Sequence, residues 1–325
     1  MASDPGAARE LPVAKADRID VHTHVVPPFW GEALPSHGGD PSGWTTPAWS
    51  PEAHLAYMDD QQIATSVLSL TAPSVVGWEG QGRRDMARRV NEFVAETVTT
   101  HPGRFGNFAT VPLPDVEGAV AEAEYALDEL GADGVVLLSN YEGAYLGDPK
   151  YAPLWDALDR RGAVVFIHPG HPLIPLLPDV PGPLVDYPFD TTRNAVQMVF
   201  AGVLDRYPDT KIILSHAGGF VPYAVMRFCE IQPALHPEGP STEELLAKFK
   251  LFYWDTALSS GPDAFPSFLA FADHERILFG SDFPYAPAPV AAAFNHLLDD
   301  HSGLTDEQKT AFNHGNARRI LPRLA

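Results

Sequence analysis

The sequence predicts an α/β fold, a (β/α)₈ barrel with long loops on its C-terminal face. Short β-branched runs alternate with longer helical patterns along the 325 residues. Most of the short runs are continuously apolar, as in VVLL, AVVFI and KIIL, which is typical of strands buried on both faces of a parallel sheet. Eight such runs span close to the ~250 residues of a typical barrel. A doubly wound open sheet is the weaker alternative, because no G-x-G-x-x-G follows the first run.

Eight segments have the composition and length of strands. We expect them at residues 18–21, 65–70, 104–111, 134–139, 163–167, 211–215, 252–256 and 276–280. Helical patterns lie between them, and the first follows Ser50, which can cap a helix that has Pro51 in its first turn. We expect helices at residues 51–62, 82–101, 116–130, 151–161, 190–207, 262–272, 289–300 and 305–321. The last helix opens on T-D-E-Q, a capping residue followed by acids.

The same pass predicts the domain organisation. Residues 1–17 are expected to form a flexible N-terminal tail, and residues 18–325 a single barrel domain. Two connections, residues 27–50 and 171–189, are long and rich in proline without strong periodicity. In a barrel both would lie at the C-terminal face, so we expect active-site loops there, with a surface excursion or a subunit contact as the alternative.

Composition excludes several classes of partner. Lys and Arg total 22 against 42 Asp and Glu, a formal net charge of −20, which argues against binding to nucleic acid or to anionic membranes. No apolar run reaches the ~18 residues that cross a bilayer, and residues 1–17 contain no apolar signal segment. Cys229 is the single cysteine, so no intramolecular disulfide can form. We expect a soluble cytoplasmic enzyme with a small-molecule substrate.

Chemistry-bearing residues follow the ends of four expected strands. His22 and His24 lie two residues apart at the end of the first strand, so both imidazoles can reach one ion. His168 and His216 directly follow the fifth and sixth strand patterns, and Asp282 follows the eighth. In a closed barrel these ends share one rim, and imidazole with carboxylate suits Zn²⁺ or Mn²⁺.

The fourth strand end bears on the number of metal ions. It reads Ser139-Asn140 and offers neither a Lys nor a Glu that could bridge two ions. We therefore expect one divalent ion, Zn²⁺ first and Mn²⁺ as the alternative. The usual motifs for organic cofactors do not occur in the sequence, so we expect no organic cofactor.

Six motifs carry a resemblance across almost the whole chain. They are IDVHTH (19–24), VFIHP (165–169), LSHAGG (214–219), YWDTA (253–257), FGSDFPY (279–285) and HGNARRIL (314–321). Together they resemble the decarboxylase branch of the amidohydrolase superfamily, which includes the aminocarboxymuconate-semialdehyde, γ-resorcylate and 6-methylsalicylate decarboxylases. The segments GGDPSGW (38–44) and FGNFATVPLPD (105–115) look nearest to the 6-methylsalicylate decarboxylases. The resemblance implies a barrel of the metal-dependent hydrolase type.

The resemblance also implies roles for individual residues. His22, His24, His168 and Asp282 match the family's metal ligands, and His216 matches the residue that assists proton transfer. Arg227 matches an arginine that reaches the neighbouring subunit's active site, which implies a homodimer.

One departure from the family bears on the substrate. The semialdehyde decarboxylases carry a substrate-binding arginine after the first strand, whereas residues 27–50 here contain no Arg or Lys and three Trp. That composition favours a flat apolar ring with one carboxylate over a dicarboxylate. Phe29, Trp30, Trp44 and Tyr285 are candidate contacts for this ring.

The expected reaction is the non-oxidative loss of CO₂ from an ortho-hydroxy aromatic acid, with 6-methylsalicylate or a salicylate-like compound as substrate. The ring carbon would be protonated first, with Asp282 and His216 as candidate catalytic residues. A metal-dependent hydrolase of a lactone or amide uses the same ligands and remains an alternative. A non-catalytic binding barrel is a third possibility, disfavoured because all five site residues are intact.

Overall fold

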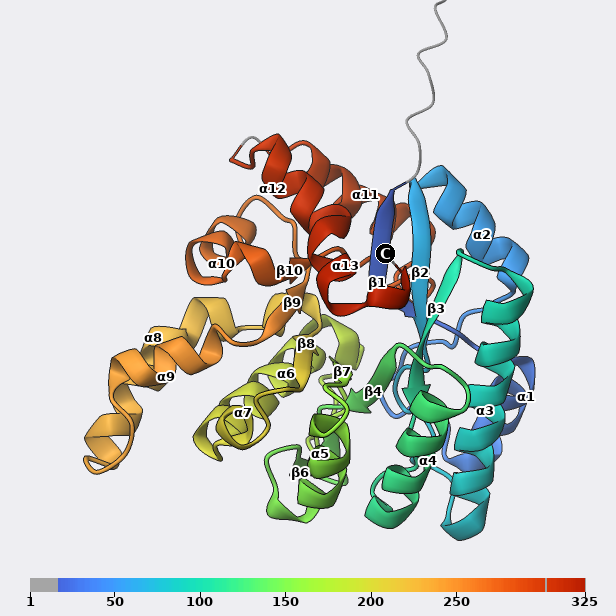
Figure 1. Cartoon of the computed structure of the whole chain (residues 1–325), viewed down its shortest axis with the longest axis horizontal. Coiled ribbons are helices and arrows are strands. Elements are labelled where there is room, and N and C mark those ends of the chain that lie inside the picture. The colour runs from blue at the N-terminus through green and yellow to red at the C-terminus, as the bar shows by residue number, and fades with distance from the viewer. Residues whose placement is uncertain (1–16, 302, 325) are drawn as a thin grey trace, which may run out of the picture.

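The computed structural model describes residues 17–301 and 303–324, and within them eight parallel strands form one sheet in the order β1-β2-β3-β4-β7-β8-β9-β10. Figure 1 shows these strands side by side, with the helices packed outside them. The sheet closes because the segment after β10 bonds to β1: Val21 N donates to Phe279 O (3.0 Å) and His24 N to Phe283 O (2.8 Å). The expected (β/α)₈ barrel is confirmed. The expected tail, residues 1–17, lies outside the described residues except for Asp17.

All eight strands fall on the expected segments. Their bounds are β1 Arg18–His24, β2 Ile63–Ser69, β3 Phe105–Thr110, β4 Gly134–Leu138, β7 Val164–His168, β8 Lys211–Leu214, β9 Tyr253–Asp255 and β10 Ile277–Leu278. A short antiparallel hairpin, β5 (Asn140–Tyr141) with β6 (Ala144–Tyr145), was not expected and extends the loop after β4.

The helices largely follow the expected pattern. Their bounds are α1 Pro28–Ala33, α2 Pro51–Asp60, α3 Gly80–Thr100, α4 Val116–Asp128, α5 Ala152–Asp159, α6 Gly182–Phe200, α7 Val203–Arg206, α8 Val221–Leu235, α9 Thr242–Phe249, α10 Phe265–Phe271, α11 Ala288–Asp299, α12 Asp306–Thr310 and α13 Asn316–Ile320. Ser50 caps α2, and Thr305 with Gln308 forms a capping box on α12. The last expected helix is present as one helical run over Asp306–Ile320, in which a π turn at Ala311–Gly315 lies between α12 and α13.

Both connections that were expected to be loops contain helix. Residues 27–50 include α1 and a 3₁₀ turn at Leu34–His37, and residues 171–189 include the first turns of α6. The prediction of residues 171–189 as a loop was wrong from Gly182 onward. Pro188 explains this error. A proline in a helix interior normally ends or kinks the helix, so the sequence argued against a helix there, whereas α6 continues through it.

The barrel interior is an apolar core closed at one end by the C-terminal segment. Inward-facing side chains from seven of the strands make up this core: Ile19, Val21, Val67, Phe108, Val136, Val164, Phe166, Ile213 and Leu278. Ala317, Ile320 and Leu321 pack against them from α13 and the residue that follows it. The amino-terminal end of the barrel is thus filled, so the opposite rim carries the chemistry.

A bulge in β1 aims its histidines into the barrel. Ile19 and Val21 already face the interior, so strict alternation would turn His22 outward. Between Asp20 and Thr23, however, β1 advances three residues while the paired β2 advances two. This extra residue changes the phase of the strand, so His22 joins His24 on the inner side.

The described residues also bear on the membrane expectation. No helix among them combines the length and the apolar character that spanning a bilayer requires.

The packed interior predicts a large effect of core truncation. Phe108 is 1% exposed and stacks on Phe166 with ring centroids 5.7 Å apart. We expect Phe108→Ala to lower the free energy of unfolding by about 3–5 kcal/mol, because the rigid barrel wall cannot collapse into the cavity. Urea denaturation measures this loss. The control Leu173→Ala, at a side chain that is 75% exposed, should change stability by less than about 0.5 kcal/mol, and equal losses would contradict the assignment of the core.

Candidate metal centre and active-site cavity

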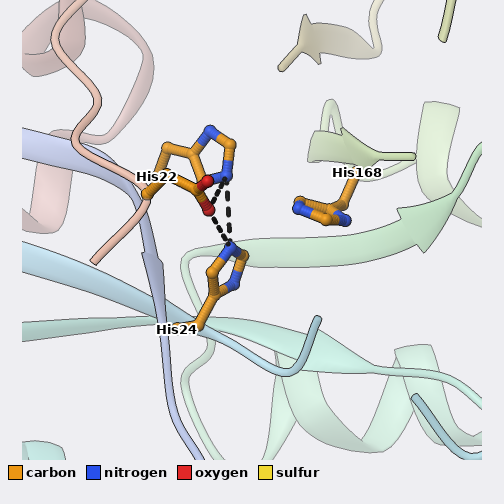
Figure 2. A group of neighbouring side chains, drawn as sticks. His22, His24 and His168 are labelled. Carbon is orange, nitrogen blue, oxygen red and sulfur yellow. Dashed lines mark hydrogen bonds and ion pairs between the residues drawn. The ribbon is translucent and has the colours of Figure 1, made fainter. Parts of the chain in front are cut away.

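Three imidazoles and one carboxylate meet at the carboxyl-terminal rim of the barrel. His22, His24, His168 and Asp282 each offer one ligand atom, and these four atoms lie within 4.8 Å of one another. Figure 2 shows the rings of His22 and His24 pointing toward each other, with His168 facing them from β7. All four residues are buried. The structure thus brings together the four residues that the sequence predicted as ligands.

Hydrogen bonds behind the rings fix which nitrogen of each histidine faces the centre. Asp255 Oδ2 lies 2.7 Å from His22 Nδ1 and can only accept, so His22 carries a proton there. The hydroxyl of Ser69 donates to Thr23 O (2.9 Å), so it accepts from His24 Nδ1 (3.1 Å). Each Nε2 atom is left facing the centre, which is the arrangement that supports metal-binding histidines.

His168, at the end of β7, is oriented in the same way by a hydrogen bond to its Nδ1 atom. Its Nδ1 atom lies 2.9 Å from the carbonyl oxygen of Pro169, so Nδ1 donates and Nε2 keeps its lone pair. The chain after Pro169 is fixed in turn, because Gly170 N donates to Ser139 Oγ (2.7 Å), and that hydroxyl donates to Asp190. Ser139 and Asp190 therefore position the backbone that orients His168.

The distances at the centre fit a bound cation. His22 Nε2 lies 3.2 Å from His24 Nε2, and Asp282 Oδ1 lies 3.2 and 3.0 Å from these two atoms. Two ligands about 2.1 Å from a common tetrahedral ion lie roughly 3.4 Å apart. Two facing nitrogen lone pairs beside a carboxylate require positive charge between them, which either a proton on His22 or a metal ion supplies. The four residues could therefore hold a divalent ion.

The ionisation of these groups agrees with that requirement. Burial disfavours a charged His22, but the carboxylates of Asp255 and Asp282 raise its pKa to about 10. Burial, reinforced by the neighbouring histidines, holds the pKa of His168 well below its usual value. Although burial opposes ionisation of Asp282, the charge of His22 and bonds from three histidines keep the pKa of this carboxyl well below its usual range. An ion would meet the carboxylate of Asp282 and the neutral imidazoles of His24 and His168. It would displace one proton from the charged His22.

Two residues of the site adopt left-handed backbone conformations. Asp282 has φ 65° and His216 has φ 52°, which is uncommon outside glycine and concentrates at functional sites. Two residues before Asp282, Gly280 passes so close to β1 that a Cβ atom there would lie 2.8 Å from His22 Cβ. Gly280 is therefore needed to bring Asp282 beside the histidines of β1.

His216 lies at the edge of the cluster. Its Nε2 atom is 3.5 Å from Asp282 Oδ2, and its backbone N–H donates to Asp255 Oδ1 (2.8 Å). Its Nδ1 atom is buried and has no hydrogen-bond partner among the described residues. His216 thus contacts the carboxylate of the candidate metal centre without belonging to the set of four.

A cavity of about 370 Å³ opens directly on this centre. His168, His216 and Asp282 form its floor. Its walls are mostly apolar and come from several elements: Trp44, Ala72, Pro183, Leu184, Tyr187, Leu258, Tyr285, Ala286, Pro287, Val290 and Phe294. The described residues that line it include no Arg or Lys. A ring of benzoate size fits this volume, and a bound metal would be the main positive charge within it.

The candidate ring contacts divide into two groups. Trp44 and Tyr285 line the cavity, and the Tyr285 ring lies edge-on to His24 with centroids 5.5 Å apart. Trp30 is instead fully buried in the core and donates from its indole nitrogen to Ser74 O (2.9 Å). Phe29 packs against Phe93 on α3. Neither Phe29 nor Trp30 is among the described residues that line the cavity, because α1 turns both side chains toward α3 and the loop after β2.

Arg227 is exposed on α8 and lines none of the described cavities of its own chain. Two residues with clear positions in the site were not assigned there from the sequence. Asp255 orients His22, and the signals for it in the sequence were its place at the end of a strand pattern and within the motif YWDTA. Asp40 lines the cavity from a segment without periodicity, so no pattern could place it.

Comparisons with known proteins agree with this site. The model of the amidohydrolase family matches residues 19–323. A 6-methylsalicylic acid decarboxylase of Penicillium expansum is 42% identical over 315 residues, which cover 94% of this chain and 97% of the relative. A crystal structure of an amidohydrolase II superposes with a TM-score of 0.87 at 33% identity, covering 94% of this chain and 100% of the other.

A crystal structure of a dihydroxybenzoic acid decarboxylase from Polaromonas sp. JS666 contains bound manganese and the inhibitor 2-nitroresorcinol. It superposes with a TM-score of 0.76 at 26% identity, covering 94% of this chain and 96% of that one. These similarities confirm the expectation of an enzyme that is a non-oxidative decarboxylase. The chain belongs to the amidohydrolase family, in its decarboxylase branch.

Proposed function

We propose that this enzyme releases CO₂ from an ortho-hydroxy aromatic acid of the 6-methylsalicylate type with the help of one divalent ion. The observation that carries this proposal is the cavity, whose floor is the His/Asp centre and whose described walls are mostly apolar and contain no Arg or Lys. One carboxylate can be neutralised at the centre, whereas a second would face a wall that offers no Arg or Lys among its described residues. The 42% identity to a 6-methylsalicylic acid decarboxylase supports this substrate class.

His22, His24, His168 and Asp282 would hold the ion, which when bound supplies Lewis acidity and a fixed positive charge for the substrate's oxygens. Histidine and carboxylate ligands suit both zinc and manganese. The manganese in the Polaromonas decarboxylase supports Mn²⁺, and the preference of Zn²⁺ for four such ligands supports Zn²⁺. Metal analysis of the isolated enzyme decides between them.

The residues around the cavity then carry out proton transfer. Net decarboxylation of a carboxylate consumes one proton: the ring carbon gains hydrogen, the bond to the carboxyl carbon breaks, and its electron pair restores the aromatic ring as CO₂ leaves. Asp282 Oδ2 and His216 Nε2, 3.5 Å apart, can hold and exchange the proton delivered to that carbon. Trp44, Tyr187 and Tyr285 enclose the ring, which excludes water from the reacting carbon.

The first test is CO₂ release. The metal-loaded enzyme should convert 6-methylsalicylate to 3-methylphenol and CO₂ in equimolar amounts, and removal of the metal with a chelator should abolish the activity until Mn²⁺ or Zn²⁺ is restored. Product is followed by chromatography and CO₂ by a coupled assay. A metal-loaded enzyme that releases no CO₂ from any substituted salicylate would overturn the proposed substrate class. Base consumption with a lactone would instead favour hydrolysis.

Two variants separate metal binding from proton transfer. His22→Ala should lose most of the bound metal, because it removes a ligand and leaves Asp255 buried without its partner. His216→Asn should retain a full equivalent of metal but lower kcat by about 10²–10⁴-fold, since it removes only the general acid–base group. Metal content is measured by elemental analysis alongside the kinetics. Wild-type kcat in His216→Asn would exclude His216 from the reaction.

We also propose that the enzyme is a homodimer in which α8 contributes to the interface. Tyr223 (88% exposed), Leu235 (66%) and Met226 (49%) form an exposed apolar face on this helix, and Arg227 lies among them. An exposed apolar face of this kind is typical of an interface with another protein chain. Arg227 would then be placed to reach the partner subunit's cavity.

Sedimentation equilibrium tests the assembly. The wild-type enzyme should have the mass of two chains, and Tyr223→Asp should shift it toward a single chain, because a buried carboxylate would oppose association. Arg227→Ala should keep the dimer while raising KM. A wild-type monomer at micromolar concentration would contradict the proposal.

A further inference from the structure

Asp40 is a fixed carboxylate at the wall of the active-site cavity. Its Oδ1 atom accepts a hydrogen bond from Ser42 N (2.8 Å), which holds the side chain in place. Ser42 is fully buried, and its carbonyl accepts from Gly182 N (2.8 Å) at the start of α6. The segment that carries Asp40 is therefore tied to α6, which also lines the cavity, and the carboxylate is a fixed part of the site.

The position of Asp40 is between two neighbouring cavities. Asp40, Ala72 and Tyr187 line both the 370 Å³ cavity over the metal centre and a second cavity of about 210 Å³. The second cavity also contacts Glu142, and the described residues that line it contain no Arg or Lys. A ring substituent that extends from the first cavity toward the second would therefore lie near the Asp40 carboxylate.

No Arg or Lys among the described lining residues offsets a second negative charge of a ligand. Burial raises the pKa of Asp40, which reflects the cost of a charge in these surroundings. Burial likewise raises the pKa of Tyr187 and Tyr285, and the charge of Asp40 adds to both shifts, in keeping with their closeness to its carboxylate. His171 is the nearby ionisable base that lines the second cavity.

We propose that Asp40 is a specificity residue that selects aromatic acids with a single carboxylate and rejects those that carry a second anionic substituent on the ring. The inference rests on the proposed function, since it assumes that the substrate's reacting carboxylate lies at the metal centre. The remainder of the ring then faces Asp40, where a neutral or hydrogen-bond-donating substituent is accepted and a carboxylate is repelled.

Matched ring compounds test the charge separately from the size. Salicylates with a carboxylate at ring position 4 or 5 are compared with the carboxamides at the same positions, which have nearly the same volume and no charge. Apparent Kd values come from the rise in Tm of the metal-loaded enzyme with ligand concentration, which requires no turnover. For the wild type, at least one carboxylate should bind tenfold or more weakly than its carboxamide.

Variants at Asp40 should change that ratio in a defined way. Asp40→Asn keeps an acceptor for Ser42 N and removes the charge, so the ratio should fall at least fivefold, whereas Asp40→Glu should preserve it. The control Asp179→Asn removes a charge from an exposed position that lines neither cavity and should leave the ratio unchanged.

The outcomes are distinct from those of the function assay. Equal binding of both compounds to the wild type, or an unchanged ratio in Asp40→Asn, would overturn the role of Asp40 even if the enzyme releases CO₂ from 6-methylsalicylate. A lowered ratio in Asp40→Asn supports it even if that substrate is not decarboxylated. The same ratio change in Asp179→Asn would show a general effect of protein charge and would also overturn the proposal.

Discussion

A buried carboxylate and three imidazoles within 4.8 Å of one another require a positive charge among them, and much of the surrounding structure serves this requirement. The acceptors behind the rings, Asp255, Ser69 and the carbonyl of Pro169, turn each Nε2 atom inward. Gly280 leaves room for the approach of Asp282 to β1. Without these hydrogen bonds and this close approach, the four residues would be polar side chains at the ends of their strands. An ion binds well only where its ligands are oriented in advance.

The barrel and the ligand set could be predicted because both depend on strand ends. Continuous apolar runs give the strands of a parallel barrel, and the residue after each run must lie at the common rim, so His168 and Asp282 were identifiable without knowledge of their contacts. The sequence placed His22 beside His24 on the inner side of the barrel, but the argument from their two-residue spacing was incomplete. Its inward direction depends on the bulge after Asp20, which no alternation pattern in the sequence reveals.

The substrate side of the cavity was less predictable, because it is built by irregular segments whose direction depends on tertiary contacts. Of the aromatic residues after β1, Trp30 enters the core and Trp44 faces the cavity, although both lie in the same proline-rich stretch. The helical course of α6 through Pro188 brings Tyr187 to the site, and local propensity argued against a helix there. Asp40 is positioned by contacts of its loop with the start of α6, which are separated from it by about 140 residues of sequence.

The seam of the barrel and three of the four residues of the candidate metal centre come from the same two stretches of chain. The hydrogen bonds that join residues 279–283 to β1 include Asp282 N to His22 O (2.8 Å), so a ligand of each stretch takes part in the closure itself. By thermodynamic linkage, an ion bound at this centre would stabilise the closed barrel, and any change that strengthens ion binding would also stabilise the closure. Local opening of the hydrogen bonds between residues 279–283 and β1 would release a bound ion. The dissociation rate of the ion would then report how often the barrel opens at this position.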